Sequence, residues 1–177
     1  MERETYPLAA AIANRRSVRQ FESTPVPDEH LRILLEAAIS APSAGNRQPW
    51  RFIVVRNPGL RLQLAQAAGG QSSVATAPVA IVVLADLART ESRYGQRGTE
   101  LYALQDTAAA IENLLLTAVS LGYATCWVGA FDEGQAARSL ELPPGLRPVA
   151  IVPVGVPAGQ PRSPDRRPLA EVVDYRD

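Results

Sequence analysis

The chain has 177 residues, of which 46% are hydrophobic and 20% charged, and this balance predicts one globular domain over residues 1–177. Its 18 basic and 18 acidic residues cancel, so no overall attraction to nucleic acid or to an anionic membrane surface is expected. The longest apolar run, residues 79–85, is too short to cross a membrane, and the N-terminus lacks a signal-peptide pattern. We therefore expect a cytoplasmic protein.

The side chains available for chemistry are few. One cysteine and one histidine exclude an intramolecular disulfide and a zinc site built from these residues. All 18 basic residues are arginines, and the absence of lysine excludes Schiff-base chemistry and a Walker A phosphate loop. Any anion that the protein binds is therefore held by arginine, whose planar guanidinium grips phosphate or carboxylate with two hydrogen bonds.

The first basic cluster follows a short helical pattern at residues 8–13. Arg15, Arg16 and Arg19 lie within five residues of one another, around Ser17. If this segment is extended, Arg15, Ser17 and Arg19 point to one side of it. The cluster is either an anion-binding site or a solvated basic turn.

A proline-rich connection, residues 41–49, joins the second helical pattern to a strand, and we call it the proline loop. Pro42 and Pro49 fix the backbone at its two ends, whereas Ser43 and Asn46 leave hydrogen-bonding groups that a strand would not use. These residues exceed what a turn requires. The loop is either a rigid element that packs Trp50 into the core or a preformed wall for a planar polar ligand.

The other elements follow from hydrophobic periodicity and from the positions of glycine and proline. Helices are predicted at residues 26–41, 60–68, 99–121 and 133–140, and strands at residues 52–56, 78–85, 124–132 and 148–155. Residues 71–73 are predicted to form a loop, and residues 88–98 a mobile polar excursion without packed structure. Because no G-x-G-x-x-G follows the strand at 78–85, a doubly wound dinucleotide fold is not supported.

The long helix at residues 99–121 predicts an oligomer. Leu104, Ala108, Ile111 and Leu115 repeat at spacings of three and four, and a second side of the helix is apolar too. A helix that is apolar nearly all round must be buried along most of its length, which is hard to achieve within so small a chain. We therefore expect a homodimer built around this helix.

The last part of the chain adds two candidates. Gly129 lies at the far end of the predicted strand 124–132, where it marks either a close approach of the backbone to a ligand or a simple turn. Residues 157–168 form a tail rich in proline and arginine, and the apolar residues that follow it need a surface to pack on. The partner subunit could provide that surface.

Four segments in this order and spacing resemble the FMN-dependent nitroreductase family over nearly the whole chain. They are R-R-S-V-R, P-S-A-G-N-R-Q-P-W, L-Q-D-T-A-A-A-I-E-N-L-L-L-T-A-V-S-L-G leading to C-W-V-G-A-F-D, and V-P-V-G-V-P with its R-R-P tail. The resemblance implies an α+β sandwich whose mixed or antiparallel sheet is flanked by helices. It also implies an intertwined homodimer with two FMN sites at the interface.

The resemblance carries site residues over to this chain. Those implied to hold the FMN phosphate and ribityl chain are Arg15, Arg16, Ser17, Arg19 and one of Arg166 and Arg167. Those implied to lie against the flavin are Pro42, Ser43 and Asn46 from the other subunit, Gln105, and the backbone of Gly129 and Ala130. Many relatives carry asparagine where this chain has Gly70, so that contact is absent or made by Gln71.

The implied chemistry needs little from the side chains, because a flavin performs hydride transfer itself. NAD(P)H would be the co-substrate, and a small-molecule acceptor such as a quinone or nitroaromatic would take the electrons in a ping-pong cycle. Three alternatives stay open: reductive dehalogenation, flavin fragmentation, and a flavin-binding module without turnover.

Overall fold

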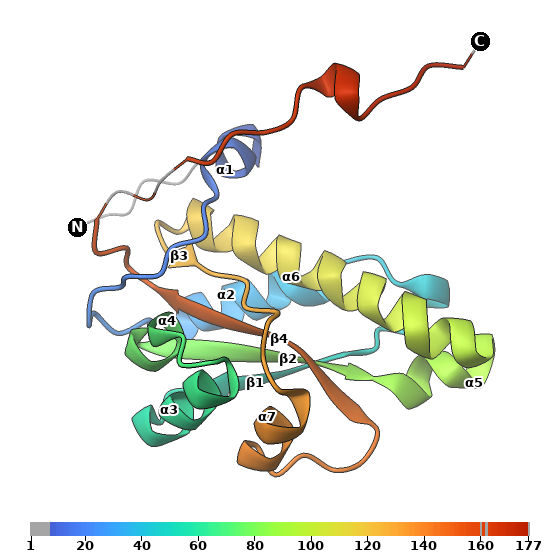
Figure 1. Cartoon of the computed structure of the whole chain (residues 1–177), viewed down its shortest axis with the longest axis horizontal. Coiled ribbons are helices and arrows are strands. Elements are labelled where there is room, and N and C mark those ends of the chain that lie inside the picture. The colour runs from blue at the N-terminus through green and yellow to red at the C-terminus, as the bar shows by residue number, and fades with distance from the viewer. Residues whose placement is uncertain (1–7, 160, 162, 177) are drawn as a thin grey trace.

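The structure is a computed structural model that describes residues 8–159, 161 and 163–176 (Figure 1). Its α-helices are α1 Leu8–Asn14, α2 Asp28–Ile39, α3 Pro58–Ala67, α4 Ser72–Thr76, α5 Leu87–Arg97, α6 Ala103–Ser120 and α7 Glu133–Ser139. Its strands are β1 Trp50–Val55, β2 Val79–Asp86, β3 Ala124–Thr125 and β4 Leu146–Gly155. Shorter turns of helix are η1 Ala44–Asn46, the π-helical η2 Gly98–Tyr102 and η3 Leu169–Glu171.

The four strands form one antiparallel sheet in the order β1-β2-β4-β3. Strand β2 is central, and seven of its eight residues are buried, as its continuous apolar run predicts. Trp50 of β1 pairs with Ala85 of β2, and Val79 at the other end of β2 pairs with Val154 of β4.

Helices cover both faces of the sheet (Figure 1). Side chains alternate across β2, so Ile81 and Val83 join a core with α2 and α6, whereas Val82 and Leu84 join a core with α3, α4 and α7. The predicted α+β sandwich with a helix-flanked antiparallel sheet is therefore confirmed.

The long helix is present, and Ile111 and Leu115 of its predicted apolar side are buried in the single chain. It begins with the π turn η2 and continues as α6, whose sides toward the core carry Ala103, Ala110, Leu114 and other small or apolar residues. Leu104 and Ala108, which were expected on the buried side, are only half-buried in the single chain. Within the described part of the chain, no helix has both the length and the apolar character needed to cross a bilayer.

The predicted strand at residues 124–132 is wrong in length, because β3 ends at Thr125. Cys126 donates its backbone N–H to the carbonyl of Pro153 at 3.4 Å, but proline has no N–H to return. The ladder resumes only at Val128, which exchanges two 3.0 Å backbone bonds with Ile151. The residues after Val128, including Gly129 and Ala130, form an exposed connection to α7.

Two segments that were predicted to lack regular structure are helical. Residues 72–76 form α4 because Val74 is fully buried against the core beside α3. The predicted excursion at residues 88–98 is α5, and it packs through Thr90, whose side chain is fully buried. A Cβ atom on Gly98 would lie 2.6 Å from the carbonyl oxygen of Thr90, so only glycine fits this contact.

The C-terminal tail leaves the body of the protein after β4 and extends away from it (Figure 1). It carries Leu169, Val172 and Tyr175, which are 68%, 54% and 83% exposed. Apolar side chains at this exposure find no cover on the described part of their own chain.

Candidate functional site

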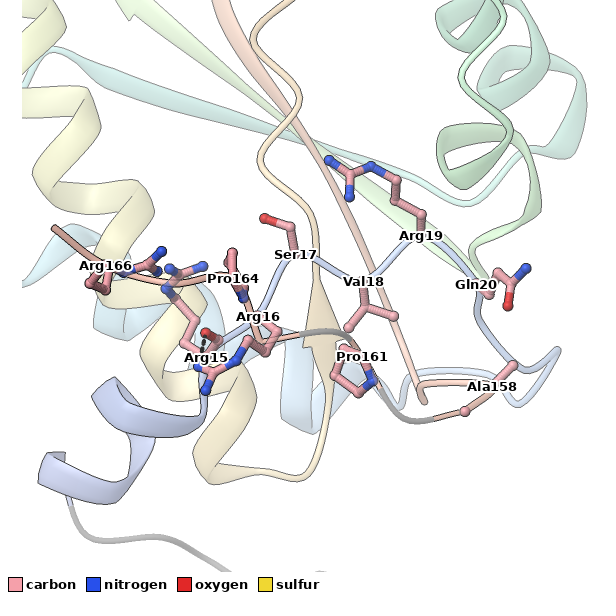
Figure 2. Close-up of a pocket in the computed structure, with 11 residues that line it drawn as sticks. Arg15, Arg16, Ser17, Val18, Arg19, Gln20, Ala158, Pro161, Pro164 and Arg166 are labelled. Atoms are coloured by element: carbon pink, nitrogen blue, oxygen red, sulfur yellow. Dashed lines mark hydrogen bonds between the residues drawn. The ribbon is translucent and has the colours of Figure 1, made fainter.

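An arginine-lined cavity of about 640 Å³ lies between the segment after α1 and the start of the C-terminal tail (Figure 2). We call it the arginine cavity. Its lining residues are Arg15, Arg16, Ser17, Val18, Arg19, Gln20, Ala158, Gly159, Pro161, Pro164 and Arg166. Four arginines and a serine around one cavity offer positive charge and hydrogen-bond donors to an anion with several oxygen atoms.

The sheet holds the arginine segment extended. Helix α1 ends at Asn14, and the backbone N–H of Val18 then donates to the carbonyl of Thr125 in β3 at 2.9 Å. Val18 is buried beneath the segment, and Ser17 and Arg19 project to the opposite side from it (Figure 2). The predicted alternation is therefore present at these three residues.

Two of the arginines also have structural partners. The Arg16 guanidinium donates to the carbonyls of Ala13 and Arg15 at 2.7 and 2.8 Å, so it satisfies carbonyls at the end of α1. Arg15 lies 3.5 Å from the carboxylate of Glu112 on α6, which fixes the direction of its side chain and offsets part of its charge. The net charge of the cavity lining remains positive.

The tail closes the cavity by running beside the arginine segment. The backbone N–H of Ala158 donates to the carbonyl of Gln20 at 3.0 Å, and the N–H of Glu22 donates to that of Val156 at 2.9 Å. Arg166 then lines the cavity (Figure 2). Arg167 turns away and bonds Glu171, with 3.1 Å from Nε to Oε2 and 2.9 Å from Nη2 to the carbonyl oxygen.

The proline loop is a tightly folded turn around η1. Gly45, Asn46 and Gln48 all have φ near +50°, a conformation that non-glycine residues adopt rarely. The hydroxyl oxygen of Ser43 accepts a hydrogen bond from the backbone N–H of Gln48 at 3.0 Å. The side-chain oxygen of Asn46 accepts a second one from the side-chain amide of Gln48 at 3.1 Å. Such closely fixed polar groups suit a preformed wall better than a flexible connection.

Asp106 holds this turn, and sequence reasoning missed it. Its side chain is only 7% exposed, and Oδ1 accepts from the backbone N–H of Ala44 at 3.1 Å, while Oδ2 has no protein partner among the described residues. Burial raises the pKa of Asp106, and the bond from Ala44 partly opposes that rise. The available signal was an acidic residue next to Gln105 in the first turn of a helix whose other side chains are mostly apolar.

Helix α5 also binds the proline loop, through arginines that the sequence did not single out. Arg47 donates to the carbonyl of Arg89 at 2.6 Å and to the Ser92 hydroxyl at 2.6 Å. Arg89 in turn donates to the carbonyl of Arg47 at 2.8 Å. The loop is thus held by α6 on one side and by α5 on the other.

The remaining predicted residues lie outside the arginine cavity. Pro42 and Gln105 are exposed, Gly129 and Ala130 lie in the exposed connection after Val128, and Gln71 is the residue before α4. Within the described part of one chain, the arginine cavity and the proline loop therefore do not line a common pocket.

An antiparallel sheet covered by helices on both faces defines an α+β protein, and its arginine cavity carries the positive charge and hydrogen-bond donors that an oxyanion requires. The sequence model of the nitroreductase family matches residues 12–75 and 63–156 of this chain. The chain belongs to the nitroreductase family.

Relatives agree with this assignment. An NADH dehydrogenase of Thermus thermophilus is 33% identical over 193 aligned residues, covering 94% of each chain. An FMN reductase [NAD(P)H] of Bacillus subtilis is 28% identical over 180 residues, covering 94% of this chain and 72% of its own. A structure with FMN from Exiguobacterium sibiricum superposes with a TM-score of 0.89 at 22% identity, covering 99% of this chain and all of its own, which shows a common fold.

The hydrogen bond between Asp106 and Ala44 predicts how the proline loop is held. Replacing Asp106 by Ala should raise amide hydrogen exchange across residues 41–49, because the acceptor for the Ala44 N–H is lost. Asp106→Asn keeps an oxygen acceptor and should restore much of the protection.

Asn113→Ala is the matched control for this prediction. It removes a 3.1 Å bond from α6 to the carbonyl of Ala37 and should leave exchange in the loop unchanged. Equal exchange in wild type and Asp106→Ala would show that the carboxylate does not hold the loop.

Proposed function

We propose that this protein is an FMN-dependent oxidoreductase that uses NAD(P)H to reduce quinone- or nitroaromatic-type acceptors in a ping-pong cycle. The observation that carries the proposal is the arginine cavity. This chain is a member of the nitroreductase family, and its own R-R-S-V-R segment lines that cavity. FMN, when bound, supplies the hydride-transfer chemistry, so the chain itself has to bind, orient and shield it.

The donors of the arginine cavity fit a monophosphate. Arg15, Ser17, Arg19 and Arg166 all line the cavity, with the side chains of Arg15 and Arg166 together and that of Arg19 beyond Ser17 (Figure 2). Their guanidinium and hydroxyl groups would supply hydrogen-bond donors to the oxygens of a phosphate. Arg16 would support them by fixing the end of α1. The chain also lacks the glycine motif that holds a pyrophosphate, which favours FMN over FAD.

The proline loop and the first turn of α6 would provide the surface for the flavin ring. Pro42, Ser43, Asn46 and Gln105 supply apolar and amide contacts there, and Asp106 holds the turn that presents them. The backbone of Gly129 and Ala130 and the side chain of Gln71, the residue before α4, would offer hydrogen bonds at another edge of the ring. Because the single chain does not bring these groups into the arginine cavity, we propose that each site combines residues of two subunits.

Apolar surface on the single chain supports this homodimer. Helix α6 leaves Leu104 and Ala108 half-exposed, and the tail carries Leu169, Val172 and Tyr175 away from its own core. Obligate dimers bury apolar surface of this kind at their interface, much as a core divided between two chains would. A second subunit would cover α6 and give the tail a surface to pack on.

The proposed function is tested by reduction of the purified yellow protein without oxygen. NADH or NADPH should bleach the flavin absorbance within seconds, and a quinone or nitroaromatic should restore it. A protein that binds FMN but stays yellow with both nucleotides would be a flavin-binding module, and one that binds no FMN would contradict the proposal altogether.

The arginine cavity predicts different effects for two adjacent arginines. Arg166→Ala should weaken FMN binding about tenfold, because a charge-assisted phosphate contact is lost. Arg167→Ala should leave FMN affinity nearly unchanged, because its guanidinium pairs with Glu171. Dissociation constants from fluorescence titration of the flavin would measure both. The opposite order would assign the phosphate to Arg167 instead.

The proposed homodimer predicts the mass of the protein in solution, and it predicts that the dimer is weakened by substitutions in the C-terminal tail. Light scattering should give about twice the 19.0 kDa mass of the chain. The double variant Leu169→Asp, Val172→Asp should weaken the dimer because both side chains lose their proposed apolar cover. Leu62→Asp changes a 53% exposed residue of α3 and serves as the control. A wild-type monomer that holds FMN would contradict the two-subunit site.

A further inference from the structure

Three arginines surround the place where α5 meets the proline loop: Arg47 from the loop, and Arg89 and Arg93 from α5. The guanidinium of Arg47 donates to the main-chain carbonyl of Arg89, and that of Arg89 donates to the carbonyl of Arg47, so the two side chains are held next to one another. A Cβ atom built on Gly45 would lie 3.1 Å from Nη1 of Arg93, so the third arginine lies over the same loop. We call these three residues the loop arginines.

Within the part of the chain that the structure describes, the loop arginines have no acidic partner. Among residues 8–159, 161 and 163–176, the carboxylates within 4.0 Å of an arginine are paired with Arg15, Arg32, Arg56, Arg147 and Arg167. Three neighbouring positive charges without a counter-ion repel one another, and that repulsion is relieved when an anion binds between them. Burial does not explain their position either, because Arg89 and Arg93 are exposed.

The loop arginines keep donors free for a ligand. Arg89 uses only Nε in its bond to the loop, which leaves both terminal nitrogens available, and Arg47 uses Nε and one terminal nitrogen. The Arg93 guanidinium lies 5.5 Å from the centre of the Tyr94 ring, and this stacking orients it without using its hydrogen-bond donors. The cluster is thus structurally held and still able to grip an anion.

We propose that the loop arginines recognise an anionic group, a phosphate, carboxylate or sulfonate, on the electron donor or the acceptor. This inference rests on the proposed function, in which the adjoining proline loop lies against the flavin ring. The arginine cavity would hold the phosphate of the resident cofactor, and the loop arginines would select the molecules that exchange electrons with it. Substrates with a negative group would then react faster than neutral ones of similar shape.

The test compares Arg93→Gln and the double variant Arg89→Gln, Arg93→Gln with the wild-type holoenzyme. For each protein, kcat/KM is measured for NADPH, NADH, a neutral naphthoquinone and anthraquinone-2-sulfonate. We expect kcat/KM for at least one anionic substrate to fall about two- to fivefold per arginine removed, as for exposed ion pairs. The value for the neutral quinone should not change in Arg93→Gln, because among the described residues the Arg93 side chain makes no hydrogen bond to the proline loop, and salt should reduce the difference between wild type and variant.

The pattern of losses identifies the anion. A fall with NADPH alone assigns its extra phosphate, a fall with both nucleotides assigns the shared diphosphate, and a fall with the sulfonate assigns the acceptor. Arg138→Gln removes the same charge from exposed α7 and should change none of these values. Unchanged values for all anionic substrates in the double variant, or an equal fall with the neutral quinone in Arg93→Gln, would overturn the proposal.

Binding without turnover keeps this result separate from the proposed function. If neither nucleotide reduces the flavin of the wild-type protein, the proposed function fails. Calorimetric titration with NADP⁺ and with anthraquinone-2-sulfonate then still tests whether the loop arginines bind an anion. Weaker binding of either compound by the double variant supports the anion site. Absence of binding to wild type, or equal binding by wild type and variant, overturns it.

Discussion

The pairing of β2 with β4 is the contact on which the site depends. Strand β2 sends alternate side chains into two cores, and its register with β4 fixes where β4 ends. From that end of β4 the tail runs beside Gln20. Thr125 of β3 pairs with Val154 of β4, and its carbonyl accepts a hydrogen bond from the backbone N–H of Val18. A change in this register would separate the two walls of the arginine cavity.

Arginine is used in this chain for both structure and recognition. A guanidinium has five donors in a fixed plane, so it can bond a main-chain carbonyl and still present donors to a ligand. Arg16 bonds two carbonyls at the end of α1, and Arg47 and Arg89 bond one another's carbonyls across the loop. A lysine ammonium could not hold one such contact with the same directionality, which accords with a chain whose basic residues are all arginine.

The sequence predicted the parts of the site that lie within one continuous segment. The arginine segment and the proline loop were recognised because their residues are adjacent in the chain, and the structure shows both as fixed, exposed features. It could not distinguish Arg166 from Arg167, since the direction of each side chain depends on a contact with Glu171. Asp106 was missed because its burial follows from the rotation of α6 against the loop.

The sequence by itself determined the central buried strand and most helix and strand positions, because hydrophobic periodicity and proline act locally, whereas the α+β class was implied by its resemblance to a known family. Only the tertiary structure decided that residues 88–98 form a packed helix and that β3 stops after Thr125. The first depends on α5 bonding to the proline loop, where Arg47 and Arg89 donate to one another's carbonyls, and the second on Pro153 lying opposite Cys126. Both are contacts between segments distant in sequence, and a local sequence pattern cannot predict such contacts.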